Sequence, residues 1–302
     1  LYKLETNGEF RLMESESPQL WGDFLRYTYA VYDFSHVKKD GFYRIAYGDQ
    51  VSQIFAISED VYKEGVWQPV LETFMPVQMC HMSVRDRGRL WHGACHLDDA
   101  VQVPAPMPYF DGFRQSDTTD TQFEPKTTIP GLNIGGWHDA GDDDVNTGSN
   151  GRTIYYLVLA MEEFGMSSDQ TTVDFERREV HLHKPDGISD AAQQVMHGVQ
   201  WLLAQYRQLD HSIVGVISSS WQTYLQTSDW SVFTDNLFYD PEMKEDEKSG
   251  THSGRFDDRY AFTNKDTRRE YMVAAILAAS SRVLSEYDPA LSAECLDVAR
   301  RI

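Results

Sequence analysis

Cysteine is scarce in this chain, and three cysteines in 302 residues are too few for the disulfide framework of a small stapled domain. Basic residues are also few, because 27 lysines and arginines stand against 47 acidic residues and leave a net charge of −20. Binding to nucleic acid or to an anionic membrane surface needs basic patches, so this balance argues against both. No run of about 18 apolar residues is present, which argues against a membrane-spanning helix.

The first part of the chain has the pattern of a β-sheet protein. Residues 1–60 alternate polar and apolar side chains with the period of strands, and Tyr43, Ile45 and Tyr47 share one face. Turn-forming pairs such as Asp40-Gly41 separate the runs. This pattern predicts most of a small β-sandwich over residues 1–60.

From residue 61 the apolar period becomes that of helices joined by long loops. Gly165 is placed to end one helix, and Asp288-Pro289 is placed to begin another. Apolar stripes at helical spacing are predicted to form helices over five stretches: 66–77, 154–161, 188–206, 272–287 and 291–302.

Both ends of the chain look like cuts. Leu1 is neither an initiator methionine nor part of a signal-peptide pattern, and the last apolar stripe ends at Ile302 without a cap or a polar tail. We therefore expect a piece of a longer protein, in which the stripe ending at Ile302 faces solvent for want of partner helices.

The string Gly-Gly-Trp-His-Asp-Ala-Gly-Asp at 135–142 is the most informative stretch. It sets Asp139 and Asp142 three residues apart in a glycine-rich loop, where both carboxylates could point at one water molecule, as a base and its orienting partner do in hydrolysis. A solvated turn or a calcium loop is the alternative, because Asp143 and Asp144 follow directly.

This string resembles the signature of the family-nine glycoside hydrolases, which are mostly cellulases, and the similarity runs with gaps from about Tyr32 to Ile302. The stretch Phe55–Tyr62 resembles the end of the immunoglobulin-like module of many members. The resemblance implies a mainly α protein, with the end of an immunoglobulin-like β-sandwich over 1–60. It implies that 61–302 are the first part of an (α/α)6-barrel catalytic domain.

The resemblance also implies an inverting mechanism with Asp142 as general base and Asp139 positioning the water. The family's general acid is a glutamate with no counterpart in this chain, so we expect residues 1–302 alone to be inactive. Trp137, beside the base, is the candidate for stacking on a sugar. The stretch Asp143–Asn146 departs from the family pattern of an aromatic, a small and a basic residue.

Two cysteines and two histidines have the composition of a closed structural zinc site: Cys80, Cys95, His96 and His138. Their spacing in the sequence does not match that of a zinc finger, and cysteine and histidine residues are often ordinary core residues. All four match a zinc site of some family members, so the resemblance implies a structural zinc ion. Cys295 is left over and is predicted to be a buried small apolar residue of a helix.

The predicted activity is hydrolysis of β-1,4-glucan linkages in a cellulose-like plant polysaccharide by a secreted or periplasmic enzyme. The alternatives are an exo-acting glycosidase of the same family and a non-catalytic carbohydrate-binding protein on the same scaffold. Trp221, Tyr224 and Trp230 lie in loops and could also stack on sugars, whereas Trp201 is expected to pack in the core. Asp98 and Asp99 are interpreted as residues of a helix start or of a solvated position, or else as partners of a ligating histidine.

Overall fold

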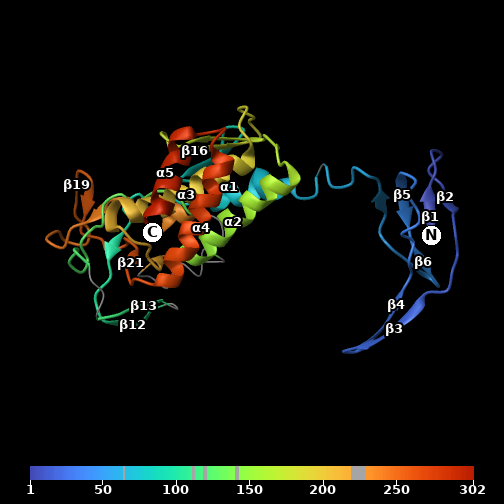
Figure 1. The fold of residues 1–302 in the computed structure, drawn as a ribbon, viewed down its shortest axis with the longest axis horizontal. Helices are drawn as coiled ribbons and strands as arrows, with labels where there is room; N and C mark the ends of the chain where they lie inside the picture. The colour runs from blue at the N-terminus through green and yellow to red at the C-terminus, as the bar shows by residue number, and fades with distance from the viewer. Residues whose placement is uncertain (64, 111–112, 118–120, 140–142, 219–228) are drawn as a thin grey trace. The chain divides into compact units, whose positions relative to one another are not determined.

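The computed structural model describes residues 1–302 except 64, 111–112, 118–120, 140–142 and 219–228. The chain divides into two compact units, Leu1–Gln68 and Pro69–Ile302, which Figure 1 draws as a ribbon. The sequence pattern placed the change from strands to helices after residue 60, and the last strand of the first unit ends at Ile57.

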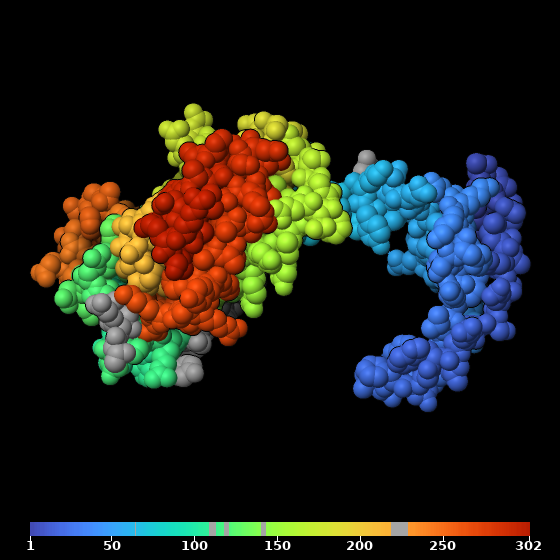
Figure 2. All heavy atoms as spheres, viewed as in Figure 1, coloured from blue at the N-terminus to red at the C-terminus, as the bar shows by residue number. Residues whose placement is uncertain are grey.

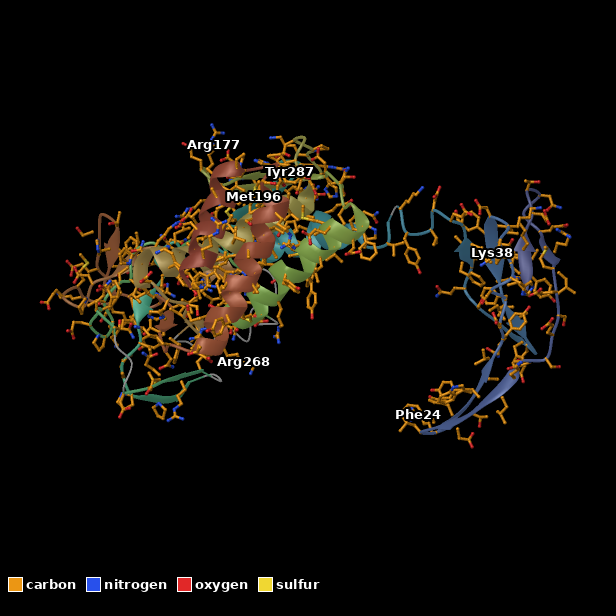
Figure 3. The ribbon with its side chains drawn as sticks, viewed as in Figure 1. Phe24, Lys38, Arg177, Met196, Arg268 and Tyr287 are labelled. Carbon is orange, nitrogen blue, oxygen red and sulfur yellow. The ribbon has the colours of Figure 1, made fainter. Side chains whose placement is uncertain are left out.

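The first unit consists of short antiparallel strands. A four-stranded sheet has the order β2-β1-β5-β8, and two separate hairpins are formed by β3 with β4 and by β6 with β7. Tyr43 is fully buried in this unit, whereas Phe24 is 56% exposed in the β3–β4 hairpin (Figure 3). The strands are β1 Tyr2–Leu4, β2 Phe10–Leu12, β3 Gln19–Phe24, β4 Tyr27–Val31, β5 Gly41–Arg44, β6 Ala46–Tyr47, β7 Gln50–Val51 and β8 Phe55–Ile57.

The second unit begins with a π-helical turn, η1 (Val70–Phe74), and the short helix α1 (Met75–Gln78), and its described residues also form four longer helices. These are α2 Thr147–Phe164, α3 Asp190–Leu209, α4 Thr267–Leu284 and α5 Pro289–Arg301. In the space-filling view, the orange-red atoms of α4 and α5 form one side of this unit (Figure 2). Within the part of the chain that the structure describes, none of the helices is long and apolar enough to cross a membrane.

The four longer predicted helices are confirmed, together with their end signals. Gly165 adopts the left-handed conformation after α2, with φ 59°, which glycine reaches without a steric penalty. Asp288 caps α5 by accepting hydrogen bonds from the backbone N–H groups of Ala290 and Leu291, and Pro289 fills the first helical position, where no N–H is needed.

Two expectations about apolar stripes are wrong. In the first stripe Val66, Val70 and Phe74 are exposed, while Leu71 and Met75 are buried. A π-helical turn has more residues per turn than an α-helix, so a spacing of four no longer keeps side chains on one face.

The stripe of α5 does not face solvent either. Leu291, Cys295 and Val298 are buried, and the Ser292 hydroxyl donates to the Ser281 carbonyl at 2.6 Å, which ties α5 to α4. The helices of this chain therefore provide a partner for the stripe that ends at Ile302.

Short strands connect the helices, which the prediction of a mainly helical chain did not anticipate. One sheet has the order β10-β9-β16-β15 and another the order β11-β21-β17-β14. The second sheet carries an apolar cluster that includes Val101, Phe113 and Phe262. The strands are β9 Ser83–Asp86, β10 Arg89–His92, β11 Val101–Gln102, β12 Met107–Phe110, β13 Phe113–Gln115, β14 Val145–Asn146, β15 Thr171–Asp174, β16 Glu179–Leu182, β17 Gly215–Ile217, β18 Phe238–Tyr239, β19 Lys248–Ser249, β20 His252–Ser253 and β21 Tyr260–Phe262, with a 3-10 turn η3 at Trp230–Val232.

Candidate active site and metal centre

The segment carrying the aspartate motif is held against the end of α1 by a short antiparallel bridge. The Cys80 N–H donates to the Gly136 carbonyl at 2.9 Å, and the His138 N–H donates to the Gln78 carbonyl at 3.0 Å. A side chain at Gly135 would place its Cβ 2.5 Å from the His197 carbonyl oxygen. Only glycine therefore allows this segment to lie directly on α3.

The four predicted metal ligands come together at this bridge. One ligand atom from each of Cys80, Cys95, His96 and His138 lies within 4.8 Å of the others, and all four side chains are buried. The Sγ atoms of Cys80 and Cys95 are 4.0 Å apart, and Cys80 Sγ is 3.8 Å from His96 Nδ1. Cys95 Sγ is 3.5 Å from His138 Nε2.

These separations fit a tetrahedral zinc ion. With Zn–S bonds of about 2.3 Å and Zn–N bonds of about 2.0 Å, tetrahedral geometry places two sulfur atoms roughly 3.8 Å apart and a sulfur and a nitrogen roughly 3.6 Å apart. The composition and the geometry of the donor set therefore agree.

Two further residues hold the ligands in orientation. His96 Nε2 lies 3.1 Å from Asp143 Oδ2, so the ring nitrogen that faces away from the cluster has a carboxylate partner. Arg259 Nη2 donates to Cys80 Sγ at 3.0 Å. Outer partners of this kind fix the tautomer of a ligating histidine and stabilise a thiolate.

The pKa values of the two cysteines of the cluster shift in opposite directions. Burial raises the pKa of Cys80, but the hydrogen bond from Cys95 and the Arg259 charge outweigh it and hold this pKa well below its usual value. Burial and the neighbouring Cys80 sulfur raise the pKa of Cys95 well above its usual value. The Cys80 thiol thus gives up its proton more readily than the Cys95 thiol, and a bound cation would favour two thiolates.

The histidines also differ. Burial and Arg259 act to lower the pKa of His96, yet the hydrogen bond to Asp143 and the Cys80 sulfur raise it to about 10. Burial lowers the pKa of His138 to about 4. His138 is thus a neutral imidazole, the form that binds metal.

Of the two predicted catalytic carboxylates, the structure describes that of Asp139. The Asp139 N–H donates to the Asp144 carbonyl at 2.8 Å. The Ser149 hydroxyl, in the first turn of α2, donates to Asp139 Oδ2 at 2.6 Å. Asp142 lies outside the described residues. Asn146 starts α2 by accepting from the N–H groups of Gly148 and Ser149.

A pocket of about 360 Å³ opens beside Asp139. Trp137 contributes to its lining but is only 6% exposed, and its indole N–H donates to Gln194 Oε1 at 2.8 Å. Little of the ring is available to a sugar in this arrangement, so stacking at Trp137 stays a prediction. Phe74, 62% exposed, lines the same pocket and was not predicted as a contact.

The other aromatic residues that the sequence analysis considered as sugar contacts are either buried or outside the described residues. Trp230 is 3% exposed and packs 4.7 Å from the His138 ring, so the expectation that it stacks on a sugar is wrong. Trp201 is fully buried, as expected for a core residue. Trp221 and Tyr224 lie outside the described residues.

The sequence did not indicate a buried polar network behind the metal ligands. The Asp99 carboxylate accepts a hydrogen bond from Arg259. The His81 ring lies between Asp99 and Gly135, with Nε2 2.9 Å from Asp99 Oδ2 and Nδ1 3.0 Å from the Gly135 carbonyl oxygen. Asp98 and Asp99 are fully buried or nearly so and stand at a turn before β11, so the expectation of a helix start or a solvated position is wrong. Asp99 pairs with Arg259 and not with a ligand of the cluster, and no local signal could have revealed a partner so distant in the chain.

The fold is that of glycoside hydrolases. The solved structure of a metagenome-derived glycoside hydrolase family 9 endoglucanase matches 99% of this chain and 46% of its own, with a TM-score of 0.61 and 20% identity. A family 9 protein from Bacteroides ovatus matches 99% of this chain and 47% of its own, with a TM-score of 0.66 and 17% identity. A Zn-binding triple mutant of the family 9 endoglucanase J30 matches 98% of this chain and 47% of its own, with a TM-score of 0.59 and 21% identity.

The family profile for glycosyl hydrolase family 9 matches residues 72–302, and the chain belongs to this family. Among curated proteins, Endoglucanase D of Acetivibrio thermocellus is 24% identical over 277 residues, which are 90% of this chain and 36% of the relative. The chain thus spans about a third of the length of this relative and less than half of the matching solved chains.

Proposed function

We propose that the protein carrying this chain is an endoglucanase that hydrolyses β-1,4-glucan linkages of a cellulose-like plant polysaccharide. The observation that supports this most directly is the position of Asp139. Family membership places the chain among glycosyl hydrolases, and Asp139 lies at a pocket with one carboxylate oxygen held by Ser149.

In the proposed inverting mechanism Asp142 takes a proton from the attacking water while Asp139 orients that water. The hydrogen bond from Ser149 fixes the Asp139 carboxylate, so that its second oxygen can accept from the water. The general acid is the glutamate that the resemblance places beyond residue 302. It would stand roughly 6.5–9.5 Å from the base, with room for a water under the sugar.

Cys80, Cys95, His96 and His138 would hold a zinc ion. Four protein ligands leave no open position for substrate, so the ion would supply no step of the reaction and would be structural. The cluster would anchor segment 136–138, which leads directly into Asp139.

We further propose that the first unit is the end of an immunoglobulin-like module and that the second is part of an (α/α)6 barrel. The solved family 9 structures that match nearly the whole chain support this reading. A secreted or periplasmic location would give the enzyme access to its polysaccharide.

An exo-acting glycosidase is the second candidate, because Asp143–Asn146 depart from the family pattern beside the base. The test measures viscosity and reducing ends together on carboxymethylcellulose with the full-length protein. An endoglucanase lowers viscosity early relative to the sugar released, whereas an exo-acting enzyme releases sugar with little loss of viscosity. Binding of cello-oligosaccharides without any release would instead indicate a carbohydrate-binding protein.

A further inference from the structure

A second cluster of possible ligands shares no residue with the four cysteine and histidine ligands. We propose that Asp98, Asp257 and Asp258 form a calcium-binding site. One carboxylate oxygen from each of the three lies within 4.8 Å of the others. This site does not depend on the proposed activity, and none of its three carboxylates has a role in the proposed reaction.

The carboxylates are buried with one oxygen each left unpaired. Asp98 and Asp258 have no exposed surface. Asp98 Oδ2 accepts from the Thr234 hydroxyl at 2.8 Å, and Asp258 Oδ2 accepts from the Tyr239 N–H at 3.1 Å. Their Oδ1 atoms are buried and have no hydrogen-bond partner among the described residues. A buried carboxylate oxygen without a hydrogen-bond partner costs folding free energy, which a bound ligand at each of these atoms would offset.

Asp257 completes the set in the same way. Its Oδ2 atom accepts from the Asp235 N–H at 2.8 Å and lies 3.2 Å from Arg255 Nε. Its Oδ1 atom is buried without a hydrogen-bond partner among the described residues. The three Oδ2 atoms are therefore held by the protein, and the three Oδ1 atoms are left for something else.

The charges in the cluster also require compensation. Three carboxylates at this separation repel one another strongly in a buried site. Arg259, next in sequence to Asp258, donates instead to Asp99, to the Asp143 carbonyl and to Cys80. Either a cation or bound protons must offset the remaining repulsion.

Ligand chemistry favours calcium. Carboxylate oxygens are hard ligands, and calcium accepts about six to eight oxygens at about 2.3–2.6 Å in flexible geometry, which three carboxylates completed by water can provide. Magnesium demands near-ideal octahedral geometry at about 2.0–2.1 Å and is seldom held by a dedicated cage of protein ligands. Water molecules or backbone carbonyls would supply the remaining positions.

The ion would join two segments that are far apart in the chain, one carrying Asp98 and the other carrying Asp257 and Asp258. Asp98 follows the predicted zinc ligands Cys95 and His96 closely, and the Leu97 N–H already donates to Asn236 Oδ1 at 3.0 Å. A cation bound to Asp98 and Asp258 would hold the loop of these ligands against the segment preceding β21. Calcium binding should therefore stabilise the loop around the metal cluster.

The test uses calcium chloride as the probe on the purified full-length protein, freed of calcium with a chelator and checked by mass spectrometry to retain its zinc. We expect one calcium ion per chain in addition to zinc. At about 1 mM calcium chloride, the Tm should rise by about 4 °C or more. The same concentration of magnesium chloride should give a smaller rise.

Asp258→Asn keeps the shape and removes one charged ligand, and Asp246→Asn in the exposed acidic segment is the control. We expect Asp258→Asn to weaken calcium binding at least tenfold and to abolish most of the Tm rise. Without calcium it should be at least as stable as the parent protein, because it relieves repulsion. Asp246→Asn should respond like the parent.

Failure to bind calcium, with the Tm unchanged by calcium, would overturn the proposal. So would an Asp258→Asn variant that is destabilised equally in both buffers with its calcium response intact, because that result would indicate carboxylates that share protons. An equal response to magnesium would overturn the choice of calcium. None of these results depends on whether the protein cleaves glucan, so failure here and failure of the proposed activity are distinguishable.

Discussion

The Nε2 atom of His96 lies 3.1 Å from the Oδ2 atom of Asp143. Asp143 directly follows Asp142, the predicted general base, so one residue connects the metal cluster to the catalytic loop. The Asp143 carbonyl also accepts from Arg259. A change at the cluster should therefore reach the loop through Asp143, as well as through His138 next to Asp139.

Loss of a cysteine ligand should remove the metal. We expect Cys95→Ser to lose zinc and to lower the free energy of unfolding by roughly 3 kcal/mol or more, because metal binding contributes directly to folding. Zinc content by mass spectrometry and unfolding by denaturant measure the two effects. Cys295→Ser is the matched control, since Cys295 is equally buried but lies on α5 away from the cluster. It should keep its zinc, and a parent protein purified without chelator yet free of zinc would contradict the site.

Removal of the base should abolish turnover but not binding. In the full-length protein we expect Asp142→Asn to lower kcat on soluble β-1,4-glucan by about 10²–10⁴-fold, because the amide cannot accept the proton of the water. Asp139→Asn should have a smaller effect. Reducing-sugar assays give the rate, and titration with a cello-oligosaccharide gives the affinity. Most of the activity surviving in Asp142→Asn would refute the assignment, and Asp246→Asn controls for loss of surface charge.

Ser149 is a positioning residue for Asp139. We expect Ser149→Ala to lower kcat roughly tenfold with little change in KM, because a hydrogen bond to a charged group contributes about 1.5 kcal/mol. Ser149→Thr should restore part of the rate. Thr153→Ala is the control, because Thr153 lines the same pocket but donates to the Ser149 carbonyl at 3.1 Å and not to Asp139. Equal losses in the alanine variants would point to a general change in the pocket.

His197 should make the second unit sensitive to acid. Burial lowers the pKa of His197 from 6.5 to about 3, and its Nε2 atom lies 2.6 Å from the Gly136 carbonyl oxygen, to which it donates. Between these pH values the unfolded chain binds a proton at His197 that the folded protein excludes, so stability falls as pH decreases from 6.5 towards 3. The slope should approach about 1.4 kcal/mol per pH unit. Denaturant unfolding across this range should show a shallower slope for His197→Gln, and an unchanged slope would contradict the prediction.

Two helical glycines should respond differently to alanine. A Cβ at Gly198 in α3 would lie 2.5 Å from Trp137 Cη2 and Ile154 Cγ1, so Gly198→Ala should cost about 1–3 kcal/mol by overpacking. A Cβ at Gly151 in α2 would meet the flexible end of Ile276 at 2.8 Å, and the gain in helix propensity, about 1 kcal/mol, should offset much of that strain. Thermal unfolding of the two variants provides the comparison, and equal costs would show that Trp137 can move aside.

Apolar periodicity and helix-end residues predicted the longer helices, but they did not predict the strands between the helices or which stripes are buried. The periodic stripes and the end signals at Gly165 and Asp288 predicted α2 to α5, because helix formation depends on residues three and four apart. The same reasoning failed at Val70–Phe74, where a π-helical turn changes which side chains share a face. Neither the short strands nor the burial of the α5 stripe followed from periodicity.

The sequence by itself determined the chemistry on offer: the paired aspartates of one loop, two cysteines with two histidines, and a strong acidic balance. Only the tertiary structure decided which of these groups meet. The burial of Arg259 between Asp99 and Cys80, and the convergence of Asp98 with Asp257 and Asp258, join segments about 160 residues apart. Such contacts depend on how the sheets and helices of the second unit pack, and a buried charge is stable only where that packing brings it a partner.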